Sequence, residues 1–345
     1  RYAWISVNYL AKKLRDKSDQ TPTPVSETVG ALDLGGASSQ ISFVPKPETI
    51  EANLSDYKSQ VANLQLFGET YRLYSSSFLC YGTEASRMRY LAALIEKVTD
   101  PKSESISSPC HLRGYDFNLL AEAVFLHPCV DSQLAKITFK KSLKKPEGLP
   151  KNLKVIGTGD PEECRQQVSS LFDFTTCEFS SCSINGVYQP PIRGKFYAFA
   201  AFQHQITFIK FKNPGINLTR SQTNKAVDEY CRMDWQEVAA NFSSKGLKYI
   251  AEYCYGGMLV DNLLQGYGFK DDESWTRIEF VEKIVEAHAS WALGYALDAT
   301  GRIPSRSPTS RLDPVAVAVG LTFLLCLLFV LLLVLLGIKK GRLVF

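Results

Sequence analysis

Residues 31–43 have the sequence ALDLGGASSQISF. A short apolar run leads into two glycines and an alternating run follows them, which predicts a β-hairpin. Backbone N–H groups from Gly35 to Ser38, together with the Ser38 and Ser39 hydroxyls, could form an anion-binding concavity at its tip. Asp33 places a carboxylate beside that anion. Because the two negative charges repel each other, the arrangement makes sense only if a cation lies between them or if the carboxylate orients a water molecule. The alternative is an ordinary glycine-rich turn capped by Asp33.

The segment DLGGASSQ within this stretch resembles the fourth conserved region of the ecto-nucleoside triphosphate diphosphohydrolases, the cell-surface apyrases. The resemblance implies an α/β protein with the two-lobed actin/Hsp70/sugar-kinase-like (ribonuclease H-like) fold. It implies catalytic roles for Asp33, Ser38 and Gln40, which would hold the attacking water and a Ca²⁺ or Mg²⁺ ion, with Asp33 at the metal. The residues expected to bind the substrate here are Gly35, Gly36, Ala37, Ser38, Ser39 and Gln40.

Two later stretches agree with the resemblance. Residues 177–202 match a second block, and the aromatic that stacks on the nucleobase in relatives corresponds to His204 here. An imidazole stacks more weakly, and His204 could equally be a surface histidine. The segment WALGY begins at Trp291; the resemblance places Trp291 near the metal without ligating it, whereas the pattern alone also fits a core anchor. Gly294 would allow close helix packing.

The first ten residues, RYAWISVNYL, match the end of the family's third conserved region. The resemblance implies a general-base Glu just before this segment and a first phosphate-binding loop further upstream. Neither is present in the 345 residues. We therefore expect the chain to be the C-terminal portion of a longer protein, holding mainly the second lobe, and we expect this portion alone to be inactive.

The chain is expected to divide into five regions. Residues 1–281 form the second lobe, residues 282–303 a helix returning to the first lobe, and residues 304–314 a stalk. Residues 315–338 carry no charge and are long enough to span a bilayer core of about 30 Å. Basic residues follow at once and predict that residues 339–345 are a cytoplasmic tail, with the body outside the cell at the plasma membrane. Membrane helices of this kind could also associate into a homo-oligomer.

The chain has nine cysteines, none with the paired C-x-x-C spacing of a zinc site. Eight of them precede residue 260, which indicates disulfides and an oxidising compartment. Three N-glycosylation sequons, at Asn53, Asn217 and Asn241, indicate the same compartment. The resemblance implies the disulfides Cys80–Cys129, Cys110–Cys164, Cys177–Cys182 and Cys231–Cys254.

Hydrophobic periodicity predicts further elements. Two strands joined at Gly68 are expected within residues 64–79, and Asp160 is expected to cap a helix that begins at Pro161. The aromatic run before residue 202 fits either a strand or a helix. A helix is expected over residues 83–98, helical patterns lie within residues 222–242 and 246–267, and the period of residues 279–298 is helical.

These features predict an enzyme that hydrolyses extracellular nucleoside tri- and diphosphates to monophosphates by direct attack of an activated water. Its partners would be those nucleotides and the lipid bilayer, because a net charge of +4 is too small to favour nucleic acid. A sugar kinase of the same fold fits less well, since such kinases are typically cytosolic and lack this cysteine pattern. The alternative from another class is a glycosylated receptor or adhesion ectodomain on an inactive apyrase scaffold.

Overall fold

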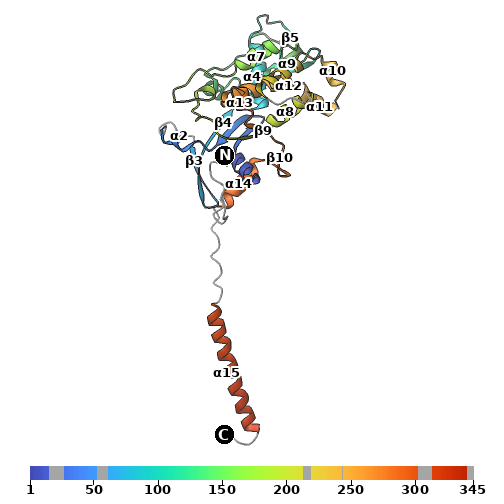
Figure 1. The fold of residues 1–345 in the computed structure, drawn as a ribbon. Helices are drawn as coiled ribbons and strands as arrows, with labels where there is room; N and C mark the ends of the chain where they lie inside the picture. Colours follow the sequence, from blue (N-terminus) through green and yellow to red (C-terminus); the bar gives the residue numbers. More distant parts are fainter. Residues whose placement is uncertain (15–26, 53–60, 213–218, 243, 302–312, 340–345) are drawn as a thin grey trace. The chain divides into compact units, whose positions relative to one another are not determined.

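The computed structural model describes residues 1–14, 27–52, 61–212, 219–242, 244–301 and 313–339 (Figure 1). The chain divides into two compact units, Arg1–Thr300 and Gly301–Phe345. The sequons at Asn53 and Asn217, most of the expected stalk and most of the expected tail lie outside the described residues.

A six-stranded mixed sheet with the strand order β3-β4-β2-β1-β8-β9 organises the first unit (Figure 1). Strands β1 (Gly30–Leu34) and β2 (Ser38–Phe43) form the predicted hairpin. Strand β1 also pairs in parallel with β8 (Phe196–Ala200), and β8 pairs in parallel with β9 (Ile278–Phe280). On the other side, β3 (Val61–Leu66) and β4 (Glu69–Leu79) extend the sheet and turn at Gly68 as predicted.

The sheet separates two hydrophobic cores. Side chains alternate along β1, so Leu32 and Leu34 enter the larger core and Ala31 enters the smaller one. Helices α4 (Thr83–Glu96), α8 (Ala201–Lys212) and α12 (Tyr253–Gly266) contribute to the larger core. Helices α1 (Tyr2–Leu10) and α14 (Trp291–Thr300) cover the opposite face, with Trp4 fully buried in the smaller core.

The rest of the first unit surrounds the larger core. A three-stranded sheet has the order β5-β7-β6, and its strands are β5 (Ser105–Ser108), β6 (Asp116–Leu120) and β7 (Asn152–Gly157). The remaining helices are α2 (Pro47–Ala52), α5 (Ala121–Phe125), α6 (Gln133–Phe139), α7 (Pro161–Ser169), α9 (Arg220–Cys231), α10 (Trp235–Ala239), α11 (Ser244–Ile250) and α13 (Asp272–Trp275), with a 3-10 turn η2 (Ile184–Gly186).

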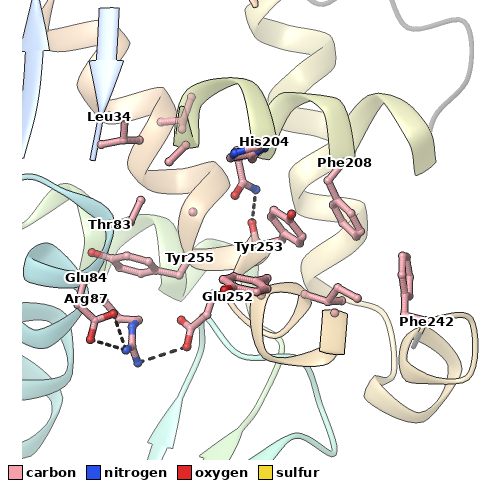
Figure 2. Close-up of a pocket in the computed structure, with 17 residues that line it drawn as sticks. Leu34, Thr83, Glu84, Arg87, His204, Phe208, Phe242, Glu252, Tyr253 and Tyr255 are labelled. Atoms are coloured by element: carbon pink, nitrogen blue, oxygen red, sulfur yellow. Dashed lines mark hydrogen bonds and ion pairs between the residues drawn. The ribbon is translucent and has the colours of Figure 1, made fainter. Parts of the chain in front are cut away.

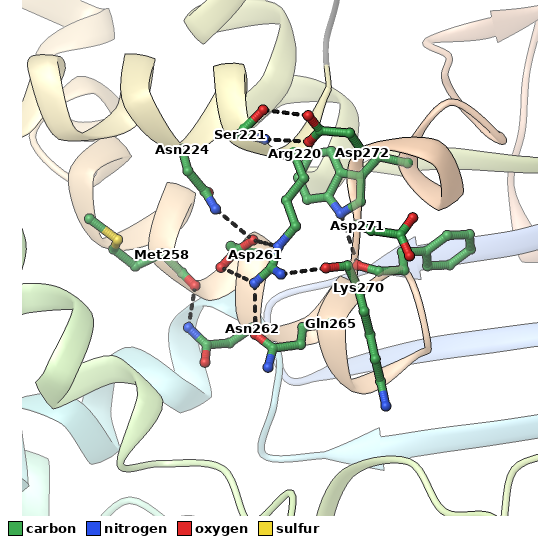
Figure 3. A network of polar contacts seen from close by, with 12 residues as sticks. Arg220, Ser221, Asn224, Met258, Asp261, Asn262, Gln265, Lys270, Asp271 and Asp272 are labelled. Atoms are coloured by element: carbon green, nitrogen blue, oxygen red, sulfur yellow. Dashed lines mark hydrogen bonds and ion pairs between the residues drawn. The ribbon is translucent and has the colours of Figure 1, made fainter.

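Arg220 fixes α12 against α9 through a dense polar network (Figure 3). Its guanidinium donates to both carboxylate oxygens of Asp261, at 2.7 and 3.1 Å. It also donates to Gln265 (2.8 Å) and to the carbonyl of Lys270 (2.6 Å). The Asp261 side chain is 6% exposed, so the bidentate pair compensates the cost of burying its charge. The C-terminal half of α12 is therefore held firmly against the start of α9.

The structure contains all four expected disulfides, Cys80–Cys129, Cys110–Cys164, Cys177–Cys182 and Cys231–Cys254. Cys326 is free and exposed. The second unit consists, in its described part, of helix α15 (Pro314–Lys339). Asp313 caps this helix by accepting a hydrogen bond from the Val315 N–H (2.9 Å). Residues 315–337 are long and apolar enough to cross a membrane.

One predicted helix is partly wrong. Residues 279–298 were expected to be helical throughout, and residues 282–303 to form one helix, but the helix starts only at Trp291. A short hairpin of β10 (Lys283–Ile284) and β11 (Ala287–His288) precedes it. Its turn residues Val285 and Glu286 adopt positive φ angles of 48° and 64°, which a helix does not contain.

Candidate active site

Three polar side chains share one face of the β1–β2 hairpin. Asp33 lies directly opposite Gln40 in the antiparallel pairing, and Ser38 lies two residues before Gln40 on the same strand. Because side chains alternate along a strand, all three lie on the face of Ala31, away from the larger core. The structure thus brings the three predicted catalytic residues together at the hairpin tip.

The Gln40 side chain is oriented by two hydroxyl groups. Its amide nitrogen lies 2.5 Å from the Ser38 hydroxyl and 3.2 Å from the hydroxyl of Ser77, which pairs with it from β4. The three side chains are only partly buried. Gln40 and Ser38 therefore form a fixed, solvent-accessible polar pair that could hold a water molecule.

The backbone of the hairpin tip leaves two amide groups unpaired. The Gly35 N–H closes the turn by donating to the Ser38 carbonyl (3.0 Å), and the carbonyls of Gly35 and Gly36 accept from the first turn of α4 at 2.9–3.0 Å. The N–H groups of Gly36 and Ala37 donate to no described residue, and both residues are exposed. Two adjacent amide donors of this kind suit an anion. The expected amide contribution of Gly35 is wrong, because the turn already uses that amide.

Gly82 permits the contact between the hairpin tip and α4. A β-carbon added at Gly82 would lie 2.3 Å from the Ser38 nitrogen and 2.4 and 2.5 Å from the carbonyl carbons of Gly36 and Ala37. Such distances are far below van der Waals contact, so only glycine fits beside this backbone. Gly82 was not predicted as a site residue, although its position directly before a predicted helix was a signal.

The carboxylate of Asp33 is partly buried and accepts no hydrogen bond from a described residue, although the α-ammonium group of Arg1 attracts its charge. The backbone carbonyl of Asp33 is the acceptor of a hydrogen bond from Ser39 (3.4 Å), but no described residue donates to the side chain. Burial raises the pKa of Asp33 from 3.8 to about 6. A carboxylate that only capped the turn would accept backbone hydrogen bonds, and this one does not. The geometry therefore disfavours the turn-capping alternative.

The oxygen chemistry of this site suits a hard divalent cation. No group of three or more His, Cys, Asp or Glu side chains gathers in the part of the chain that the structure describes. Mg²⁺ in nucleotide sites is commonly held by one or two carboxylates, substrate phosphates and waters, and Ca²⁺ also accepts waters among its ligands. The carboxylate of Asp33, which accepts no hydrogen bond, beside the amide donors of Gly36 and Ala37 fits that pattern.

Two other expectations need correction. The Ser39 hydroxyl was expected at the substrate, but Ser39 is fully buried and accepts a hydrogen bond from the Tyr267 hydroxyl (2.8 Å). Alternation along β2 turns it to the core face, opposite Ser38. The reading of Trp291 as a core anchor is also wrong, because its side chain is 62% exposed at the start of α14. Asn241 is exposed, as its glycosylation would require.

A pocket of about 690 Å³ opens beside the hairpin and α4 (Figure 2). Leu34 from β1 and Thr83 from α4 line it at one end. Its aromatic wall consists of His204 and Phe208 from α8, Tyr249 from α11, Tyr253 and Tyr255 from α12, and Phe242. The rings of Phe208 and Tyr253 are stacked with centroids 4.0 Å apart. His204 thus lines a pocket, as its predicted role requires.

The floor of the pocket carries three charged groups. Arg87, one turn after Thr83 on α4, donates to both carboxylate oxygens of Glu84 at 2.9 and 3.0 Å. Its guanidinium also lies 3.2 Å from the carboxylate of Glu252, the residue before α12. The buried ring of His111 lies behind Glu252, with its Nε2 3.7 Å from Oε2. Glu84, Arg87 and Glu252 are called the floor triad below.

Sequence reasoning missed the floor triad and most of the aromatic wall. Arg87 follows Thr83 by four residues, the spacing that places two side chains on one helix face, so a signal for Arg87 existed. Glu252 and Tyr253 carried no local signal, because only tertiary packing brings α12 to α4.

Comparisons with known proteins agree with this geometry. Residues 1–312 match the GDA1/CD39 (nucleoside phosphatase) family. The chain is 34% identical over 333 residues to ectonucleoside triphosphate diphosphohydrolase 1 of Mus musculus and 36% identical over 346 residues to ectonucleoside triphosphate diphosphohydrolase 3 of the same species. These matches cover 95% and 96% of the chain, and the chain spans 61% of the length of each relative.

A solved structure shows the same fold. The crystal structure of nucleoside triphosphate hydrolases from Neospora caninum matches with a TM-score of 0.58 at 17% sequence identity. The match covers 86% of this chain and 62% of that one. It confirms the expected actin-like α/β fold. With the family match over residues 1–312, these findings establish that the chain belongs to the GDA1/CD39 (nucleoside phosphatase) family.

Proposed function

We propose that the protein hydrolyses extracellular nucleoside tri- and diphosphates to monophosphates by direct attack of water on a terminal phosphate. The observation that carries the proposal is the hairpin tip, where the unpaired amides of Gly36 and Ala37 lie beside Ser38, Gln40 and Asp33. The adjoining pocket with its aromatic wall has room for the nucleoside.

Each group at the tip has a defined task in this reaction. The amides of Gly36 and Ala37 donate hydrogen bonds to phosphate oxygens, whose negative charge must be stabilised as the bond to the leaving group breaks. Ser38 and Gln40 orient the attacking water, and Asp33 would hold a Ca²⁺ or Mg²⁺ ion. When bound, such an ion neutralises phosphate charge.

The nucleobase would lie against the aromatic wall. His204, Phe208 and Tyr253 offer flat surfaces on which any base can stack, which favours broad base tolerance. The imidazole of His204 contributes less stacking area than a tyrosine would.

The proposal places the enzyme body outside the cell. Four disulfides require an oxidising compartment, and the candidate membrane helix of residues 315–337 would anchor the protein in the plasma membrane. We further propose glycosylation at Asn53, Asn217 and Asn241, a cytoplasmic tail after residue 338, and residues 1–281 as the second lobe of the whole enzyme.

The substitution Asp33→Asn tests the proposal in the whole protein. It keeps the shape of the side chain and removes the charge that a hard cation needs. We expect kcat for ATP and ADP to fall at least about 100-fold, measured against Ca²⁺ and Mg²⁺ concentration on membranes matched for expression.

Asp173→Asn is the matched control, because Asp173 accepts hydrogen bonds from the backbone of Thr175 (2.9 Å) and Thr176 (3.0 Å) and so does cap a turn. Asparagine caps such turns comparably, so this variant should keep wild-type turnover. If Asp33→Asn behaved like the control, with unchanged metal dependence, the hairpin would be a structural turn and the receptor alternative would stand.

A further inference from the structure

We propose that a second pocket, on the opposite face of α4 from the candidate active site, binds a phosphate group, either as free phosphate or as a small phosphate monoester. This second pocket has a volume of about 380 Å³ and is lined by the second half of α4, the end of α6 and residues 170–173. Small-molecule sites typically have volumes of about 300–1,000 Å³. The inference goes beyond the proposed function, because no step of the proposed reaction uses this pocket.

Helix α4 separates the second pocket from the candidate active site. Arg87 lines the pocket beside the hairpin and Arg89 lines the second pocket. Two residues turn an α-helix by about 200°, so these side chains leave opposite faces of α4. Gly82 contacts the hairpin tip at the start of α4, whereas Glu96 lies at its end, about 20 Å away along the helix axis. An anion in the second pocket is therefore not the phosphate of a substrate bound at the hairpin tip.

The two carboxylates of the second pocket already have donors. Glu96 accepts hydrogen bonds from the Lys141 ammonium group (2.9 Å) and from the Lys144 N–H (3.1 Å). Asp173 accepts from the N–H groups of Thr175 (2.9 Å) and Thr176 (3.0 Å). Neither carboxylate is therefore available to neutralise the other cations that line the pocket.

Three of these cations have no carboxylate beside them. Arg89, Lys97 and Lys140 all line the second pocket, and no carboxylate of a described residue lies within ion-pair distance of them. Lys97 donates to the neutral side chain of Gln167 (2.6 Å). The positive charge of the pocket thus exceeds its negative charge, and guanidinium and ammonium groups are the side chains that bind phosphate best.

Arg89 is the buried cation of this set, with only 5% of its surface exposed. Its guanidinium lies over the ring of Phe139, 3.6 Å from the centroid, and donates to the carbonyls of Cys129 (3.2 Å) and Lys141 (3.1 Å). Its Nε–H donates to no described residue. Burial lowers the pKa of Arg89 from 12.5 to about 10, so the group stays charged at neutral pH at a cost in free energy. A bound anion would offset that cost.

Apolar side chains beside the cations leave room for an organic group. They are Ala93, Phe139, Leu143, Leu171 and Phe172. Pockets for small organic ligands combine such a lining with a few charged groups. A phosphate monoester would place its charge at the cations and its organic part against these side chains, whereas free phosphate would use the cations alone.

The test is the rate at which an amine-reactive reagent labels Lys97 and Lys140 in the whole protein, measured by peptide mapping and mass spectrometry. Both lysines are exposed, so the reagent reaches them in the unliganded protein. We expect saturating AMP to slow the labelling of both at least about 5-fold, because a bound ligand protects according to its occupancy. Adenosine lacks the phosphate and should leave both rates unchanged. Equal protection by inorganic phosphate would identify free phosphate as the ligand, and protection by AMP alone would identify a monoester.

Lys136 is the matched control, since it is an exposed lysine of α6 that does not line the second pocket. AMP should not change its labelling. Lys140→Gln should reduce the protection of Lys97 by AMP to below about 2-fold, whereas Lys136→Gln should leave it unchanged. Arg89→Gln should abolish the protection, and if this buried substitution prevents folding, Lys140→Gln decides the test.

Two results would overturn the phosphate site. One is unchanged labelling of Lys97 and Lys140 in the presence of both AMP and inorganic phosphate. The other is equal slowing at Lys136, which would mean that the ligand or its ionic strength affects lysines in general. Neither result bears on the proposed function, which the release of phosphate from ATP and ADP decides.

Discussion

At the scale of single residues, the site is defined by polar groups that the fold leaves unpaired. The amides of Gly36 and Ala37 and the carboxylate of Asp33 make no hydrogen bonds to described residues. Asp33 is partly buried, so its charge costs free energy in the unliganded protein, whereas the exposed amides of Gly36 and Ala37 are open to water and to a ligand. A cation at Asp33 would recover the cost of burying that charge.

The raised pKa of Asp33 predicts how stability depends on pH. Burial raises this pKa from 3.8 to about 6, so the folded protein binds the proton more tightly than the unfolded chain does. The contribution of protonated Asp33 to the free energy of unfolding is therefore complete below pH 3.8 and lost as the pH rises through about 6. An asparagine side chain at this position would have no charge to bury.

We therefore expect Asp33→Asn to raise the thermal midpoint of metal-free protein at about pH 7.5 and to leave it unchanged near about pH 3.5. The measurement is thermal unfolding in a chelator across this pH range. Added Ca²⁺ or Mg²⁺ should stabilise the wild type at the higher pH but not the variant. If the thermal midpoints of the two proteins changed with pH in the same way, the charge of Asp33 would not be desolvated as described.

At the scale of elements, close packing of α1 on α14 supports the sheet face that carries the hairpin's polar side chains. The Gly294 N–H donates to the Ser6 hydroxyl (2.7 Å), which joins the two helices. A β-carbon at Gly294 would lie 1.9 Å from the Tyr2 carbonyl oxygen, which belongs to the backbone and cannot rotate away. The helices can approach this closely only because residue 294 is glycine.

Gly294→Ala should consequently destabilise the first unit by about 1–3 kcal/mol, the usual cost of overpacking, although alanine is the better helix former. The matched control is Gly320→Ala in α15, where an added β-carbon meets nothing within 4 Å. The measurement is the thermal midpoint of each variant against wild type. An unchanged or raised midpoint for Gly294→Ala would mean that α1 and α14 do not pack as closely as described.

The same elements show what the sequence could predict. The hairpin, α4 and the capped start of α7 were predictable because turn glycines, caps and apolar periods are local signals. The hairpin of β10 and β11 was not, because Val281 and Ile284 fit a helical period as well as a strand. The pocket was only partly predictable, since His204 had a family counterpart but Glu252 meets Arg87 only through tertiary packing.

At the scale of the whole molecule, disulfides connect segments that are distant in the sequence. Cys110–Cys164 joins the end of β5 to α7 across 54 residues, whereas Cys177–Cys182 closes a loop of only 5. Cys231–Cys254 joins α9 to the start of α12, one residue after Tyr253. The pocket wall therefore depends on cross-links as well as on hydrophobic burial.

Loss of the long cross-link should cost much more stability than loss of the short one. Chain-entropy arguments give about 4 kcal/mol for a separation of 54 residues and about 2 kcal/mol for one of 5. Both Cys110 and Cys164 are also fully buried, so their removal adds a packing cost. We expect Cys110→Ala/Cys164→Ala to lower the thermal midpoint and cell-surface abundance strongly, and the control Cys177→Ala/Cys182→Ala to lower them slightly. Equal thermal midpoints for the two double variants would contradict this ranking. Finding these cysteines as reduced thiols in protein taken from intact cells would contradict the proposed extracellular placement of the first unit.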